Sequence, residues 1–154
     1  MRFTIAAVGK PRDAALAETI RDYETRAARY WPLTIVEIRG EPARGRRAQD
    51  VRAREATRLR AAVPGSSAIW VCDRGGKSQS SEEFARWLQR TREAARDTAF
   101  LIGGAFGLDD ALREDAAGAV SLAPFTLPHE LARLVLAEQL YRAGTILRGE
   151  PYHK

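Results

Sequence analysis

Five short runs of apolar and β-branched residues recur along the chain, and longer segments with a helical period separate them. We expect strands at Phe3–Val8, Leu33–Ile38, Ala68–Cys72, Ala99–Ile102 and Ala119–Leu122. We expect helices at about Ala14–Ala28, Ala48–Ala62, Ser81–Arg96, Asp109–Ala116 and His129–Leu147. Strands that alternate with helices favour an α/β fold in which helices flank a mostly parallel sheet.

Two helix starts carry clear sequence signals. Ser80 and Glu83 have the spacing of a capping box. Pro128 fits the first position of the last helix, where its missing N–H has no partner to lose. Segments 40–45 and 64–67 contain glycine and proline and predict loops, and no internal repeat is visible.

The length and composition are typical of one soluble globular domain over residues 1–154. Hydrophobic residues make up 45% and charged residues 29%, and no apolar run approaches the ~20 residues of a membrane span. Residues 1–9 predict a first strand, not a signal peptide, so we expect a cytoplasmic protein. Cys72 is the only cysteine and the two histidines lie far apart, so we expect no internal disulfide and no metal.

The net charge of +5 is unevenly distributed. Residues 1–60 carry 14 Arg and Lys against 8 Asp and Glu, whereas residues 61–154 carry 11 against 12. Eight arginines crowd one loop and the helix after it: Arg39, Arg44, Arg46, Arg47, Arg52, Arg54, Arg58 and Arg60. Such a cluster can bind RNA phosphates in a salt-dependent manner. It can equally be a solvated helix face, because charge alone identifies no partner.

A glycine-rich segment, residues 103–107, follows an apolar strand and precedes a short helix. Its glycines allow the backbone to turn sharply and to approach a ligand closely, although a plain turn would use the same residues. The spacing is not that of a dinucleotide-binding fingerprint. Residues 76–78 resemble the end of a phosphate-binding loop, but the required earlier glycine falls at Val71, so that motif is rejected.

Two further segments near the carboxyl terminus are candidates for ligand binding or catalysis. Residues 123–128 contain two stiffening prolines and lead directly into a helix, so their backbone groups can bind a polar small molecule. The chain ends on Tyr152, His153 and Lys154. Most chain ends are disordered, but an aromatic and a histidine after Pro151 favour an ordered, functional tail.

With residues 8–10 and 73–77, these segments resemble the ribosomal RNA large subunit methyltransferase H family of the SPOUT superfamily, and the resemblance covers essentially the whole chain. It implies a deep trefoil knot formed by the last strands and helix, with S-adenosylmethionine held by the knot's loops. The cofactor-binding residues that it implies are Cys72, Gly104, Ala123, Pro124, Phe125, Thr126, Leu127 and Pro128, mostly through backbone contacts. Two positions depart from the family: Cys72, where relatives often carry leucine, and Phe106, where they tend to have a polar residue. We interpret the Cys72 thiol as a packing group, not a nucleophile.

The last predicted helix has apolar residues on more than one face. Leu131, Leu134, Val135, Leu136, Leu140, Ala143, Ile146 and Leu147 cannot all face one core, which indicates two interfaces. Glu138 and Arg142 have the spacing of an ion pair within one helix. The resemblance implies that this helix lies in a homodimer interface, with Arg142 close to the active site.

The resemblance also implies the reaction, methylation of N3 of a pseudouridine in large-subunit ribosomal RNA on assembled ribosomes. An imide nitrogen reacts poorly while protonated, so the site needs a base or a group that stabilises the anion. We expect His153 to remove the proton, Arg142 to stabilise the negative charge, and the tail with Tyr152 to close over the site. We interpret His129 as a capping or packing residue. Two alternatives stay open: a non-catalytic ribosome- or RNA-binding module with a knotted fold, and a tRNA base methyltransferase.

Overall fold

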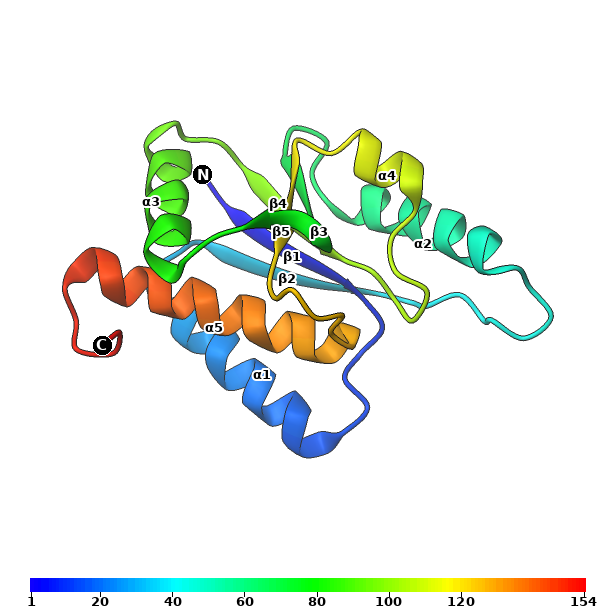
Figure 1. The fold of residues 1–154 in the computed structure, drawn as a ribbon, viewed down its shortest axis with the longest axis horizontal. Helices are drawn as coiled ribbons and strands as arrows, with labels where there is room; N and C mark the ends of the chain where they lie inside the picture. The colour runs from blue at the N-terminus through cyan, green and yellow to red at the C-terminus, as the bar shows by residue number, and fades with distance from the viewer.

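Five parallel strands form one sheet in the computed structural model, which describes residues 1–154 (Figure 1). The strands are β1 (Phe3–Val8), β2 (Leu33–Ile38), β3 (Ala68–Ser78), β4 (Thr98–Ile102) and β5 (Gly118–Ser121), in the order β2-β1-β4-β3-β5. The helices are α1 (Ala14–Ala27), α2 (Ala48–Ala62), α3 (Ser81–Glu93), α4 (Asp110–Glu114) and α5 (His129–Arg148). The α/β prediction with a parallel sheet is therefore confirmed.

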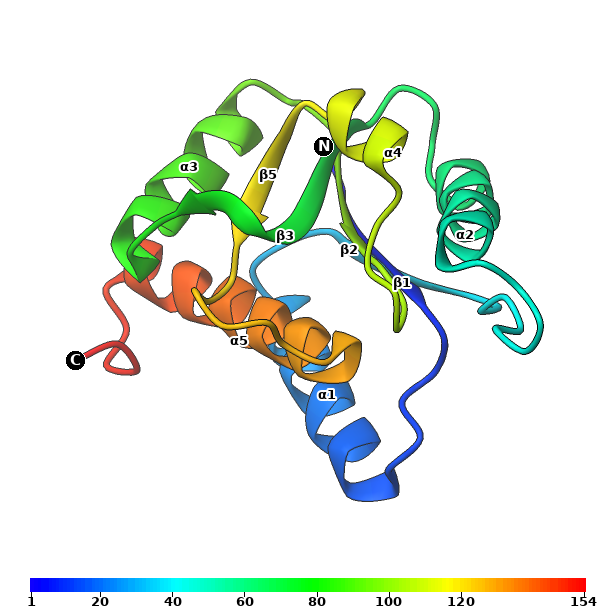
Figure 2. The ribbon, with the colours of Figure 1, turned by 45° about the vertical axis from the view of Figure 1, so that its right-hand side comes forward.

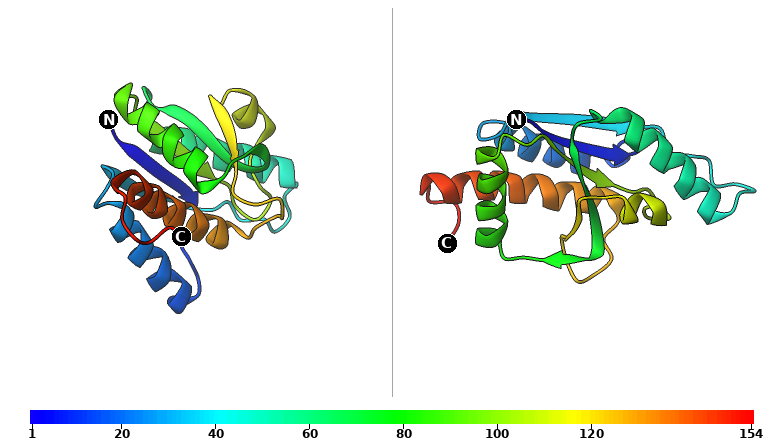
Figure 3. Two further views of the ribbon diagram at one scale, coloured as in Figure 1. Left: turned by 60° about the vertical axis from the view of Figure 1, so that its left-hand side comes forward. Right: turned by 90° about the horizontal axis from the view of Figure 1, so that it is seen from above.

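Helices cover both faces of the sheet (Figure 2). Because side chains alternate along a strand, β1 directs Phe3 and Ile5 toward α1, α3 and α5, and directs Ala6 and Val8 toward α2 and α4. The largest helix, α5, packs between α1 and α3, and its carboxyl end lies beside α3 (Figure 3). None of the helices is both long and apolar enough to cross a membrane.

Several element boundaries differ from the sequence-based expectation, most by one or two residues, and three differences have a clear structural reason. β3 continues to Ser78, because a register shift between Cys72 and Lys77 lets the strand bulge and then pair with β5 again. α3 ends at Glu93, where the following Ala95 adopts a left-handed φ of 51°. Pro128 is the residue before the first helical turn of α5, not its first helical residue.

Specific polar contacts fix α5 against the sheet. The Trp31 indole N–H donates to the Leu140 carbonyl at 2.8 Å. Arg133 is 4% exposed and its guanidinium donates to the Glu24 carboxylate at 2.7 Å and to Glu37 at 2.6 Å. These bonds satisfy a buried charge, and they also hold the amino-terminal half of α5 in register with α1 and β2.

Candidate functional site

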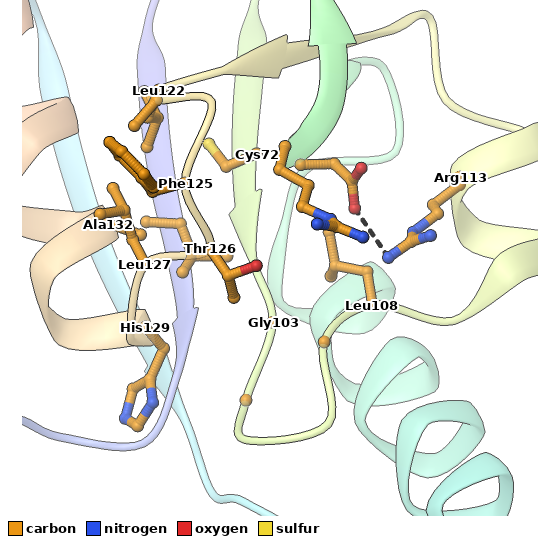
Figure 4. A pocket seen from close by; sticks show the side chains of 16 residues that line it. Cys72, Gly103, Leu108, Arg113, Leu122, Phe125, Thr126, Leu127, His129 and Ala132 are labelled. Carbon is orange, nitrogen blue, oxygen red and sulfur yellow. Dashed lines mark ion pairs between the residues drawn. The ribbon is translucent and has the colours of Figure 1, made fainter.

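A cleft opens at the carboxyl ends of β3, β4 and β5, where parallel sheets commonly place their ligand sites (Figure 4). Three segments form the cleft: the bulged part of β3, the glycine loop 103–107 after β4, and the proline loop 122–128 after β5. Its volume is about 190 Å³. The lining residues are Cys72, Asp73, Arg74, Ile102, Gly103, Gly104, Gly107, Leu108, Arg113, Leu122, Ala123, Phe125, Thr126, Leu127, His129 and Ala132.

The glycine loop turns back on itself at the edge of the cleft. The Gly107 N–H donates to the Gly104 carbonyl at 3.0 Å, and Gly107 has a φ of 78°, which disfavours any side chain there. A Cβ on Gly103 would lie 2.7 Å from the Gly107 backbone. A Cβ on Gly104 would instead meet Glu55 and Val8, so the side-chain direction of Gly104 points to α2 and β1.

The proline loop presents its backbone to the cleft. The N–H groups of Ala123, Phe125, Thr126 and Leu127 donate to no protein acceptor, so they are free to bind a ligand. The Ala123 carbonyl accepts a hydrogen bond from the Ser121 hydroxyl at 2.9 Å, which fixes the start of the loop. Phe125 is 79% exposed, an unusual state for a large apolar side chain.

The polar side of the cleft comes from Asp73, Arg74 and Arg113. Asp73 follows Cys72 in β3, and its carboxylate forms an ion pair with Arg113 at 2.7 Å. The same carboxylate accepts a hydrogen bond from the Gly75 N–H at 2.8 Å.

Burial, with a smaller effect of Asp73, raises the pKa of the Cys72 thiol to about 12. A neutral thiol is a poor nucleophile, which supports the interpretation of Cys72 as a packing residue.

His129 also lines the cleft, from the first turn of α5. No side chain caps this helix, so His129 is not a capping residue. Its Nε2 lies 3.9 Å from the neighbouring Glu130 carboxylate.

The carboxyl-terminal tail docks on the last turns of α5. Glu138 accepts hydrogen bonds from Arg142 Nε at 2.9 Å and from the Tyr152 hydroxyl at 3.0 Å, so the expected pair of Glu138 and Arg142 is present. The Arg142 guanidinium also lies 4.7 Å from the centre of the Tyr152 ring. Burial, with hydrogen bonds to Tyr23 and Glu138, raises the pKa of Tyr152.

His153 lies between two charged groups. Its Nε2 is 2.8 Å from the Glu82 carboxylate and its Nδ1 is 3.4 Å from Arg142 Nη1. A guanidinium can only donate, so Nδ1 is the acceptor and Nε2 carries the proton that is donated to Glu82. Hydrogen bonding, mainly from Ser80 and also from His153, lowers the pKa of Glu82 to about 2.

The tail and the cleft are separate within one protomer. Ala132 lines the cleft and Arg142 holds the tail, and Arg142 follows Ala132 by ten residues of the helix, a rise of about 15 Å. The structure brings six of the eight sequence-predicted cofactor residues to the cleft; Pro124 and Pro128 belong to the same loop but are not among its lining residues. Arg142, Tyr152 and His153 contact one another but not the cleft.

Comparison with known proteins identifies the family. A family model described as "Predicted SPOUT methyltransferase" matches residues 1–153. The chain belongs to this SPOUT methyltransferase family. It is 58% identical over 154 residues to a protein of Gemmatimonas aurantiaca, with 100% of both chains covered. It is also 42% identical over 160 residues to a protein of Paracoccus denitrificans, which covers 100% of this chain and 99% of that one. Both relatives are named ribosomal RNA large subunit methyltransferase H.

Membership in this family confirms the expected enzyme class, a methyltransferase, and implies the knotted fold. Three polar residues that line the methyltransferase's cleft were absent from the sequence-based list: Asp73, Arg74 and Arg113. A signal for Asp73 and Arg74 existed, because both directly follow the apolar part of a parallel strand. Arg113 had no such signal, since only the packing of α4 brings it to Asp73.

Proposed function

We propose that the cleft binds S-adenosylmethionine and that the enzyme transfers its methyl group to N3 of a pseudouridine in large-subunit ribosomal RNA, on assembled ribosomes. S-adenosylmethionine supplies a methyl group on a positively charged sulfur. The single observation that carries the proposal is the set of unpaired backbone N–H groups in the proline loop beside the cleft. Such groups suit the hydrogen-bonding edge of a nucleoside.

The residues present fit this cofactor. The apolar side chains of Ile102, Leu122 and Ala132 line the cleft and suit the flat face of an adenine ring. Asp73 and Arg74 supply charged groups that suit the polar methionine part of the molecule. We assign cofactor contacts to Cys72, Gly104, Ala123, Pro124, Phe125, Thr126, Leu127 and Pro128.

The tail supplies the groups for proton removal. In our proposal the single lone pair of His153 Nδ1 gives up its long 3.4 Å contact with Arg142 and takes up the N3 proton of the base instead. The deprotonated nitrogen would then accept the methyl group that the cofactor would supply, which would leave a neutral sulfur. Arg142 stabilises the negative charge on the base before transfer, and Tyr152 holds Arg142 in place through its ring and Glu138.

A homodimer reconciles the separate positions of tail and cleft. Leu131, Val135, Glu138 and Arg142 follow one stripe of α5, opposite the buried stripe of Leu136, Leu140 and Ala143. Leu131 is 39% exposed, and the exposed Phe125 lies on the preceding loop. We propose that a second copy covers this stripe and that its tail closes over the cleft.

The RNA substrate is proposed from the relatives' names and from charge. Arg44 and Arg47 are exposed and form no ion pair, whereas Arg46, Arg54 and Arg58 all bind the buried carboxylate of Glu41. Cations without an internal partner can bind phosphates and release counterions. We therefore propose that this arginine cluster contacts ribosomal RNA, and that the enzyme acts in the cytoplasm, where ribosomes are.

The proposal is tested on ribosomes from a strain that lacks this gene. The purified enzyme and S-adenosylmethionine should add one methyl group to a pseudouridine of the large-subunit RNA, located by mass spectrometry of nuclease fragments. Free tRNA serves as the comparison substrate. Methylation of tRNA with none on ribosomes would contradict the proposed substrate, and cofactor binding without methylation of any RNA would contradict the proposed activity.

A further inference from the structure

Glu55 of α2 lies behind the glycine loop and has no part in the function proposed above. Its side chain is only 5% exposed. One carboxyl oxygen, Oε1, accepts a hydrogen bond from the Glu41 N–H at 3.0 Å. The other, Oε2, is buried and has no hydrogen-bond partner. A buried oxygen without a partner is costly, so its retention calls for an explanation.

The unpartnered oxygen faces the cofactor cleft through one peptide unit. A Cβ on Gly104 would lie 2.9 Å from Glu55 Oε2 and 3.2 Å from Oε1, so no side chain separates the carboxyl from the loop backbone. Gly104 itself lines the cleft. The Glu55 carboxyl is therefore close enough for its charge to act on a group bound in the cleft.

The surroundings leave the charge of Glu55 only partly compensated. Burial raises the pKa of Glu55, and the neighbouring Arg58 on α2 and His129 on α5 act in the opposite direction. Arg58 also binds the carboxylate of Glu41. Glu41 offers Glu55 its backbone N–H, and its own negative charge is shared among three arginines. A positive charge in the cleft would favour the ionised form of Glu55.

We propose that Glu55 is a selectivity residue that favours the cationic cofactor S-adenosylmethionine over its neutral-sulfur product S-adenosylhomocysteine. This inference rests on the proposed function. Loss of the methyl group removes the positive charge from sulfur, so the attraction to the Glu55 carboxylate is lost when the reaction is complete. An interaction of single charges across one peptide unit in a partly solvated site gives a preference on the order of tenfold. With Glu55 the enzyme thus binds S-adenosylmethionine more tightly and releases S-adenosylhomocysteine more readily.

The proposal predicts a proton release that can be measured without methyl transfer. Since the bound cation favours the ionised carboxyl, binding of S-adenosylmethionine expels the proton from those molecules in which Glu55 still carries one. S-adenosylmethionine should therefore bind more tightly as pH rises through the Glu55 transition. S-adenosylhomocysteine should show a weaker dependence.

The test is calorimetric titration of the dimeric enzyme with each compound, for the parent, Glu55→Gln and the matched control Glu18→Gln. Glu18 is an exposed carboxylate on α1, so its replacement makes the same charge change far from Gly104. We expect Glu55→Gln to reduce the affinity ratio of S-adenosylmethionine to S-adenosylhomocysteine by about tenfold, with Glu18→Gln unchanged. An unchanged ratio in Glu55→Gln would overturn the proposal.

Titration of the parent enzyme in two buffers of different ionisation enthalpy gives the number of protons released, from about pH 5 to about pH 8. We expect proton release in the parent and none in Glu55→Gln. We also expect release in His129→Gln, which removes the other proton acceptor beside Glu55. Absence of release from the parent at every pH would overturn the proposal even if Glu55→Gln fails to fold. If the parent binds neither compound, the proposed function fails first and the inference falls with it.

Discussion

Replacement of Gly104 by valine should weaken cofactor binding markedly at modest cost to the fold. The Cβ of a side chain at this position would lie 2.9 Å from Glu55 Oε2 and 3.0 Å from Val8 Cγ1. Val8 is 4% exposed and Glu55 5% exposed, so neither side chain has solvent to move into. The glycine loop is the free partner, and it must shift toward the cleft to relieve the contact.

The size of the effect follows from the cost of overpacking, about 1–3 kcal/mol. If the loop has to return to its original place to admit the cofactor, the same free energy opposes binding, which lowers the affinity by about 5- to 150-fold. Gly104→Ala, which adds one carbon, should fall between the parent and Gly104→Val. The melting temperature should fall by at most about 12 °C, because 1 kcal/mol shifts a chain of this length by about 2–4 °C.

Calorimetric titration with S-adenosylmethionine measures the affinity, and circular dichroism at rising temperature checks that each variant is folded. Gly65→Ala is the matched control, because a Cβ there would meet nothing within 4 Å. The reasoning is refuted if a folded Gly104→Val enzyme binds the cofactor as tightly as the parent. In that case the loop tolerates a side chain without narrowing the cleft.

Further predictions concern the arginines, the tail and the cysteine. Arg44→Gln with Arg47→Gln should weaken ribosome binding and reduce the slope of log affinity against log salt by about 1.4–1.8, with cofactor affinity unchanged; an equal slope would make these arginines a solvated surface only. Deletion of residues 152–154 should leave a folded, cofactor-binding dimer with greatly reduced methyl transfer, and a full single-turnover rate would remove the tail from catalysis. His153→Ala should recover partly at high pH, because the base nitrogen then ionises without help; a slow variant with no alkaline recovery would assign His153 to substrate positioning. The Cys72 thiol should react slowly with iodoacetamide at neutral pH, since its pKa is raised to about 12, and rapid labelling followed by mass spectrometry would contradict the raised pKa.

Much of the architecture could be predicted because local patterns determine it. The alternation of strands and helices predicted all ten elements, and the capping box at Ser80 and Glu83 gave the start of α3 correctly. The second half of β3 was missed, because its glycines and charged residues do not resemble a strand. That segment is extended because Lys77 and Ser78 pair with β5. Gly76 lies so close to β5 that a Cβ there would be 2.6 Å from the Ala119 backbone.

The cleft was predicted in outline and its electrostatics were not. Loops after parallel strands meet at one edge of the sheet, so the glycine and proline loops could be expected to lie together. The contact of Glu55 with Gly104 joins residues from α2 and from the loop after β4, and no local pattern encodes it. The same holds for the arginine cluster, in which a buried Glu41 neutralises part of the charge that the sequence presents as free.

The most direct test is a methylation assay with the purified enzyme, S-adenosylmethionine and ribosomes that lack the modification. We predict one methyl group at N3 of a pseudouridine in the large-subunit RNA, with transfer greatly reduced in Gly104→Val at low cofactor concentration and in the enzyme without residues 152–154. This prediction would be contradicted if the parent enzyme bound the cofactor in the cleft but modified no nucleotide of the ribosome.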